Sequence, residues 1–192
     1  MFDSLKNHFS RHIQLSPKEE DIVHSLFRHR KFRKHQFILQ EGEVCRHESF
    51  IVKGLTRTYQ LDAKGQEHVW QFGLEDWWVG DLVSFLSGTP SLVNIACLED
   101  VDVLQIAKDD LEQLYLRVPA FERYFRILIQ NAYLTAMNRV GAGLSLSAGE
   151  RYADFIQRYP HIGERVSDKQ IASFLGITPQ SLSRLRRPPT LP

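Results

Sequence analysis

The chain has 192 residues, enough for one or two domains with a hydrophobic core. Lysine and arginine number 24 against 23 acidic residues, so the formal net charge of +1 does not by itself indicate a nucleic-acid partner. Cys45 and Cys97 are too few for a disulfide framework or a four-cysteine cluster, and we expect both to pack as small apolar residues. The polar start of the chain excludes a secretory signal, and no apolar run approaches the ~18 residues of a membrane span, so we expect a cytoplasmic protein.

The first 30 residues have a helical pattern. Ser16 and Glu19 form a capping box with Pro17 in the first turn. An apolar stripe follows at Ile22, Val23, Leu26 and Phe27. We interpret the basic run from 28 to 34 as a solvated connector, with a second DNA contact as the less favoured alternative.

From about residue 32 to 106 the apolar period changes to two, which is typical of strands. The expected strands are residues 36–40, 49–53, 55–61, 67–72, 93–97 and 101–106. Asp62 to Gly65 predict a hairpin turn. Many short strands with regular turns predict a closed antiparallel barrel or roll.

Residues 77–91 interrupt this strand pattern. Gly80 and Asp81, followed by apolar residues, predict a short helix, after which Gly88, Thr89 and Pro90 turn the chain back. Free amides at the start of a helix inside a roll are suited to an anion. The alternative is a roll filled by its own aromatic side chains, and both interpretations stay open.

A short helix is expected over 109–117, ended by Pro119, and a long one over 120–140, ended by Gly141 and Gly143. The apolar surface of the long helix is too wide for one neighbour to cover. We therefore expect one side to pack on the roll and another on a second copy of the chain. The predicted dimer residues are Phe125, Ile129, Ala132, Ala136 and Val140, and the two alanines would allow close approach.

A capping box at Ser147 and Glu150 opens a further helix that Pro160 ends. Residues 166–187 then predict two short helices around a tight turn. Ser167 with Gln170 caps the first helix, Gly176 provides the turn, and Thr178 caps the second helix ahead of Pro179. Leu182 and Leu185 are expected to bury one face of that helix.

This is the pattern of a helix-turn-helix. From Arg165 onward there are five basic residues against one acid, Asp168. Arginine can bind guanine, glutamine can pair with adenine, and hydroxyl groups reach phosphates. The predicted DNA-binding residues are Thr178, Gln180, Ser181, Ser183, Arg184 and Arg187. An ordinary helical hairpin is the alternative.

The order of these elements resembles the Crp–Fnr family of bacterial transcription regulators over nearly the whole chain. The most specific parts are Gly80-Asp81 with Gly88-Thr89-Pro90, and the run IASFLGITP over 171–179. The resemblance implies an α+β fold: a cyclic-nucleotide-binding-like jelly roll with N-terminal helices over 1–118, a dimerisation helix over 119–144 and a helix-turn-helix domain over 145–192. It further implies a homodimer on double-stranded DNA, RNA polymerase as a partner and a small-molecule effector in the roll.

Two departures from the family pattern limit this expectation. Members that bind a cyclic nucleotide have a Gly-Glu pair for the ribose and a later arginine for the phosphate, where this chain has Asp81 and Ser91. A hydroxyl cannot neutralise a phosphate as a guanidinium does. The predicted effector pocket is Gly80, Asp81, Leu82, Val83, Ser91 and Leu92. Cyclic AMP is not expected to bind there unless another arginine, such as Arg57, supplies the charge.

The second departure lies at the C-terminal end, where only a few proline-rich residues follow the helix-turn-helix. We therefore expect the β-hairpin wing of the family to be absent and the helices to provide the phosphate contacts.

Other classes of function are less favoured. A cupin-type metal enzyme needs clustered ligands, but His35, His47 and His68 include no His-X-His pair. No nucleophile elbow, phosphate loop or paired-carboxylate motif occurs, so we predict no catalytic residue, no metal site and no enzyme. An effector sensor that binds only proteins is the remaining alternative.

Overall fold

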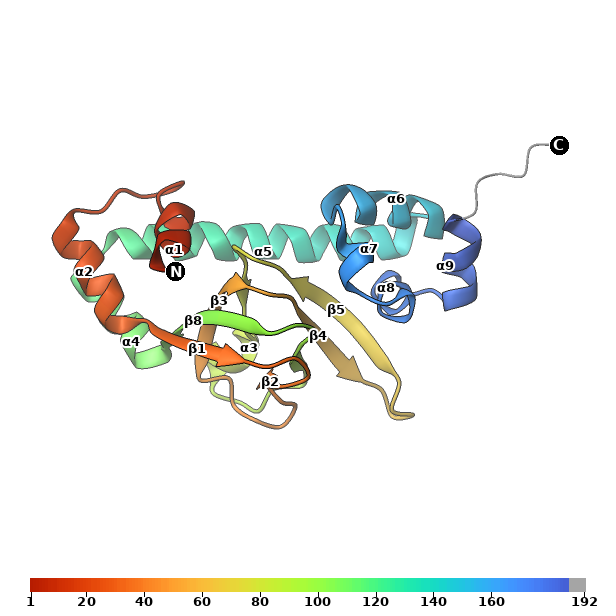
Figure 1. Cartoon of the computed structure of the whole chain (residues 1–192), viewed down its shortest axis with the longest axis horizontal. Coiled ribbons are helices and arrows are strands. Elements are labelled where there is room, and N and C mark those ends of the chain that lie inside the picture. The colour runs from red at the N-terminus through yellow and green to blue at the C-terminus, as the bar shows by residue number, and fades with distance from the viewer. Residues whose placement is uncertain (187–192) are drawn as a thin grey trace.

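The structure is a computed structural model that describes residues 1–186. The long helix α5 (Ala120–Ser145) runs beside a β-roll, with N-terminal helices at one end and C-terminal helices at the other (Figure 1). The other helices outside the roll are α1 (Phe2–Phe9), α2 (Pro17–Leu26), α4 (Lys108–Arg117), α6 (Ala148–Arg158), α7 (Ile162–Arg165), α8 (Asp168–Leu175) and α9 (Pro179–Arg186). Among the residues that the structure describes, no helix is both long and apolar enough to cross a bilayer.

The roll consists of two four-stranded antiparallel sheets. One sheet has the order β1 (Arg28–Phe32), β8 (Val101–Ala107), β3 (His47–Lys53) and β6 (Trp78–Val79). The other has the order β2 (Phe37–Leu39), β7 (Asn94–Cys97), β4 (Thr56–Leu61) and β5 (Glu67–Gly73). All six expected strands are present with bounds shifted by at most two residues, and the predicted α+β fold is confirmed.

The basic run from 28 to 34 is not a connector, so that prediction was wrong. Its first part is β1, which pairs with β8 from Arg28 opposite Gln105 to Phe32 opposite Val101. β1 lies at the edge of its sheet, where charged side chains are common because they discourage pairing with other chains. An edge strand of this kind has no apolar alternation by which the sequence could indicate it.

The expected end of the long helix was also wrong. α5 continues through Gly141 and Gly143 to Ser145, and neither glycine has a positive φ. A glycine lowers helix stability by about 1 kcal/mol relative to alanine but does not by itself end a helix. The connection to the next helix is correspondingly short, since Ser147 already caps α6 through the predicted capping box with Glu150.

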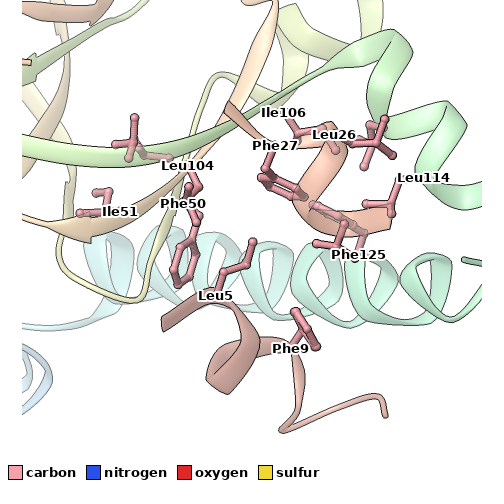
Figure 2. Packing of buried hydrophobic residues seen from close by; sticks show 14 of the residues in the cluster. Leu5, Phe9, Leu26, Phe27, Phe50, Ile51, Leu104, Ile106, Leu114 and Phe125 are labelled. Atoms are coloured by element: carbon pink, nitrogen blue, oxygen red, sulfur yellow. The ribbon is translucent and has the colours of Figure 1, made fainter. Parts of the chain in front are cut away.

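The larger of two hydrophobic clusters joins the roll to the helices at its N-terminal side. Figure 2 shows Leu5 and Phe9 of α1, Phe50 of β3 and Phe125 of α5 meeting within it. The two cysteines expected near the strands, Cys45 and Cys97, are buried and unpaired. This part of the chain therefore forms a continuous core around α5.

The smaller cluster joins the roll to the helix-turn-helix. From the roll it includes Leu55, Tyr59, Val69, Phe72 and Ala96, and from the C-terminal helices Phe155, Tyr159, Ile162, Val166, Ile171, Ala172, Leu175 and Leu182. Helix α8 lies against β5 in this arrangement. The helices of the predicted helix-turn-helix are consequently packed on the β4–β5 hairpin.

Candidate functional site

The helix-turn-helix has the local geometry that its sequence predicted. Ser167 and Gln170 form a reciprocal capping box at the start of α8. Gly176 ends α8 in the left-handed conformation with φ 66° and ψ 35°, which a side chain would make costly. The hydroxyl of Thr178 accepts a hydrogen bond from the Ser181 amide at 3.2 Å and so caps α9.

One face of α9 is open to solvent and polar. Leu182 is fully buried against α8, whereas Gln180, Ser183 and Arg184 are exposed. These three occupy one side of the helix by their three- and four-residue spacing. Arg187 continues the same spacing but lies outside the described residues. This is the arrangement needed to place side chains against base edges in a major groove.

Leu185 of α9 differs from its expected role, and two hydroxyl groups at the start of the helix contact each other. Leu185 is 36% exposed instead of buried, because its side chain lies at the rim of the domain near Gly149. The hydroxyl groups of Thr178 and Ser181 lie 3.0 Å apart and bond to each other. Both hydroxyls therefore stabilise the start of the helix before any contact with DNA.

Polar contacts hold the helix-turn-helix on the roll. Arg165 donates hydrogen bonds to both carboxylate oxygens of Glu75 and of Glu99, over 2.7–3.0 Å. These hydrogen bonds raise the pKa of Arg165. Burial alone would raise the pKa of Glu75, but its hydrogen bonds with Arg165 lower the pKa overall.

A second set of contacts joins α8 to strand β5. The Ser173 hydroxyl donates to the Glu67 carbonyl at 2.7 Å and accepts from the Val69 amide at 2.9 Å. Arg139 of α5 donates to the carbonyl groups of Val69 and Phe174 and lies 4.1 Å over the Phe174 ring. Helix α8 is thus fixed to both the sheet and the long helix.

The predicted effector pocket around α3 (Leu82–Ser87) is occupied by its own side chains. One oxygen of Asp81 accepts the amides of Val83 and Ser84, at 3.1 and 3.2 Å. The other oxygen accepts the Ser91 hydroxyl at 2.7 Å. An internal carboxylate therefore takes the helix N-terminus that could have held an external anion.

The remaining predicted pocket residues do not enclose a ligand. Val83 and Leu92 are 75% and 65% exposed, Leu82 is half-buried, and Gly80 lies beside Glu48. Of the aromatic residues near the loop, Phe85 is buried in the larger cluster and Trp78 packs on it. The alternative of a roll filled by its own aromatic side chains thus describes this segment better than an open anion cradle.

Arg57 does not supply the missing charge. Its guanidinium forms a two-pronged ion pair with Glu67 and lies 4.4 Å over the ring of Tyr59. Tyr59 belongs to the smaller cluster, next to the helix-turn-helix. The arginine is therefore committed to the outer side of the hairpin, away from Asp81 and Ser91.

Helix α5 leaves one long apolar stripe exposed. Its residues are Ile129, Tyr133, Met137, Val140 and Leu144, which are between 42% and 86% exposed. Their spacing of three or four residues places them on one side of the helix. Ala132 and Ala136 are also exposed. Phe125, in contrast, is only 7% exposed and packs against Trp78 and Tyr115, so it belongs to the core of its own chain and not to a dimer surface.

Sequence reasoning missed Glu48 on strand β3. Its side chain is buried, and Oε1 has no hydrogen-bond partner in the described part of the chain. Burial, with a smaller contribution from the charge of Asp81, raises the pKa of Glu48 to about 8. The carboxyl lies against Gly80 with no room for a Cβ atom there. A single acid at the start of an otherwise apolar strand was the only signal in the sequence.

The histidines considered for a metal site do not come together. Within residues 1–186 no group of three His, Cys, Asp or Glu side chains is close enough to hold a metal ion. His68 pairs with Asp62 at 3.1 Å on the hairpin, and His47 lies on a different sheet.

The chain is similar to known proteins in both sequence and fold. Residues 29–117 match the family described as cyclic nucleotide-binding domain. FixK2 from Bradyrhizobium japonicum is 22% identical, with 83% of this chain and 82% of that one covered and a TM-score of 0.70. The catabolite activator protein of Thermus thermophilus is 19% identical, with 89% of this chain and 82% of that one covered and a TM-score of 0.60. No curated protein sequence matches the chain.

A proposed Crp/Fnr-family transcriptional regulator from Eubacterium rectale is 18% identical, with 89% of this chain and 82% of that one covered and a TM-score of 0.68. The shared fold is a β-roll followed by a long helix and a helix-turn-helix. Residues 29–117 are similar to cyclic nucleotide-binding domains, and the chain as a whole has the same fold as these solved structures.

Proposed function

We propose that this protein is a transcription regulator that binds specific sequences of duplex DNA through α9. The exposed row of Gln180, Ser183 and Arg184, opposite the buried Leu182, is the observation that carries the proposal. Glutamine and arginine are the side chains best suited to read adenine and guanine in the major groove. The fold shared with FixK2 and the catabolite activator protein supports the same function.

Selection of bound fragments from a random DNA pool tests this proposal and identifies the site. Arg184→Ala should weaken binding to the selected site by about 1–3 kcal/mol and relax specificity at one base pair. Arg187→Ala should weaken binding to all sequences alike, as expected for a phosphate contact. Arg158→Ala is the matched control, since Arg158 is an exposed arginine on α6 with Asp154 as its partner. Equal binding by the Arg184→Ala variant and the parent chain would contradict the assignment.

We further propose that the active form is a homodimer assembled along the exposed stripe of α5. The stripe from Ile129 to Leu144 is continuous and apolar, and a second copy of the same helix would cover it. A two-fold dimer would place two α9 helices about 34 Å apart, so the selected DNA sites should be near-palindromic.

Sedimentation of the purified chain tests the dimer. Met137→Glu should convert it to a monomer, because a charge would then be buried in the shared interface. Leu116→Glu is the control, since Leu116 is 76% exposed on α4, away from the stripe. A parent chain that is monomeric at micromolar concentration with and without DNA would rule this assembly out.

We also propose that the cyclic-nucleotide-binding roll of this chain does not use cyclic AMP as its effector. The carboxylate of Asp81 already occupies the α3 amides and is fixed by Ser91, so a cyclic phosphate would meet a negative charge. Calorimetric titration with cyclic AMP and cyclic GMP tests this, and micromolar binding of either would overturn it. RNA polymerase remains the expected protein partner of such a regulator.

A further inference from the structure

A cavity opens beside β2 and the loop that leads into β3, with Ile95 of β7 and Gln105 of β8 contributing walls from the two sheets. Its volume is about 410 Å³, within the range of small-molecule sites. It adjoins a shallower hollow of about 720 Å³, and both include Ile38, His47 and Gln105 in their walls. Of the residues predicted around α3, only Gly80 lines the cavity, so this is a different place in the roll.

The cavity has apolar residues on its buried side, although polar groups make up the larger part of its exposed lining. Leu39 and Ile95 are buried there, and Ile38 and Val44 are half-buried. The strand register explains the polar groups at the mouth. Gln105 on β8 faces Ser49 of β3 and Arg28 of β1, so His47 and Arg30, each two residues away, share its side of the sheet.

The mouth of the cavity is cationic. Arg30, Arg46 and His47 line the two hollows, and their side chains have no hydrogen bond or ion pair with any residue that the structure describes. Burial, followed by the charges of Arg30 and Arg46, lowers the pKa of His47, against a weaker opposite effect of Asp110 on α4. The two arginines thus act on the same imidazole, and no acid in the described part of the chain lies at hydrogen-bonding distance from these three side chains.

One acid lines the cavity but does not neutralise this group. Glu43 accepts the Gln40 amide at 3.1 Å within its own loop. Lys31 and His35 add further positive groups along the outer hollow. The site therefore combines an apolar patch around Leu39 and Ile95 with a cationic entrance.

We propose that this cavity binds a small organic anion, with its apolar body between the sheets and its carboxylate or phosphate head against Arg30, Arg46 and His47. Such a ligand would place its charge where the protein supplies unpaired cations and its hydrocarbon where Leu39 and Ile95 exclude water. The site is independent of the α3 amides that Asp81 occupies.

The cavity is linked to α3 by a short path. Cys45, which lines the cavity, donates its amide to the Ser84 hydroxyl of α3 at 2.9 Å. Ser84 in turn donates to the Thr89 carbonyl at 2.6 Å. A ligand against Cys45 would therefore contact the backbone that positions α3.

Calorimetry of the full chain with three probes tests the proposal. Octanoate carries both features, octanol has the same chain without the charge, and inorganic phosphate has charge without the chain. We expect octanoate to bind at least about tenfold more tightly than either of the other probes. Arg46→Ala and Arg30→Ala, both at exposed positions, should each weaken octanoate binding by about fivefold.

Arg33→Ala is the matched control, an exposed arginine of the same segment that does not line either hollow, and it should bind octanoate like the parent. Octanoate should also raise the pKa of the His47 imidazole, measured by NMR titration, because the bound anion offsets the neighbouring arginines. Octyl phosphate in place of octanoate distinguishes the two head groups. Equal affinity for octanoate and octanol, binding of phosphate but not octanoate, or no binding of any probe at millimolar concentration would each overturn the proposal.

Discussion

The roll has two attachments to helices, and they are built differently. The larger cluster joins the roll to the N-terminal helices, and polar side chains within this attachment bond to one another. The Trp78 indole N–H donates to the Tyr124 hydroxyl at 2.9 Å, and the same hydroxyl oxygen lies 2.7 Å from His8 Nδ1. Burial lowers the pKa of His8, so the neutral imidazole can accept a hydrogen bond from the Tyr124 hydroxyl. Towards the helix-turn-helix, the aromatic contacts are rimmed by the ion pairs of Arg165.

The difference indicates which attachment can open. A core sealed by apolar side chains and satisfied hydrogen bonds is lost only on global unfolding. The second attachment is smaller, and partly exposed charges at its rim contribute little in water. We infer that the helix-turn-helix can leave the roll while the remainder of the fold stays intact.

The largest expected effect breaks the first attachment. Phe121 of α5 is fully buried and packs on Phe9 of α1. Phe121→Ala should lower the free energy of unfolding by about 3–5 kcal/mol, because it leaves a cavity in the larger cluster. Phe174→Ala, at a half-buried position over Phe72, should cost less and loosen only the helix-turn-helix. Chemical denaturation monitored at both ends of the molecule distinguishes the two, and equal global losses would argue against two kinds of attachment.

A gain in stability is expected from Glu48→Gln. Because burial raises the pKa of Glu48 from 4.5 to about 8 in the folded state, the folded chain holds a proton that the unfolded chain releases between these pH values. Stability should therefore fall as pH rises across this interval, and the glutamine variant should lack that part of the slope. At pH 8 we expect the variant to be more stable by about 2–4 kcal/mol, with no difference below pH 4.5.

Thermal unfolding of both chains across this pH range measures the effect. Glu19→Gln serves as a control, since Glu19 is a partly exposed acid that is hydrogen-bonded in the α2 capping box and cannot produce a gain of this kind. A Glu48→Gln variant that is less stable than the parent at pH 8 would show that the carboxylate is charged and paired in the folded chain.

A smaller effect is expected at the second attachment. Arg165→Ala removes the bridge to Glu75 and Glu99, and since these groups are partly exposed we expect a loss of about 1 kcal/mol. Amide exchange in α8 and α9 should become faster, while exchange in β3 and β8 should not change. The stabilisation that Glu75 provides is fully present above its unfolded pKa near 4.5, and it is lost as pH falls through the lowered pKa of the folded state. The stabilities of the parent and the variant should therefore converge in acid. Unchanged exchange in α8 would contradict the proposed role of this bridge.

The smallest expected effect concerns Ser173. Ser173→Ala leaves the Val69 amide and Glu67 carbonyl without their partner and should cost about 0.5–1.5 kcal/mol. Faster exchange of the Val69 amide would report the change. Ser145→Ala on α5 removes only a hydroxyl bond within its own helix and should leave that amide as it is.

Many of the helix caps, turns and strands could be predicted from the sequence, because they depend on local residue types. The capping boxes at Ser16, Ser147 and Ser167, the turn at Gly176 and the alternating strands depend on neighbours within a few residues, so their residue types indicate them directly. The polar face of α9 opposite Leu182 follows in the same way from helical spacing. The edge strand β1 could not be predicted, because it forms by pairing with the distant strand β8. The continuation of α5 past Gly141 was missed because a glycine does not by itself end a helix.

The sequence by itself determined the succession of elements and the helix-turn-helix, since each is a matter of residue type and short-range spacing. Only the tertiary structure decided that Asp81 turns back onto the α3 amides, that Arg57 pairs with Glu67, that Phe125 faces the core and that Glu48 is buried without a partner. These outcomes depend on which strands and helices meet across long stretches of chain. The contact between α8 and β5 belongs with them, because it joins residues about a hundred positions apart through a single serine hydroxyl and its aromatic neighbours.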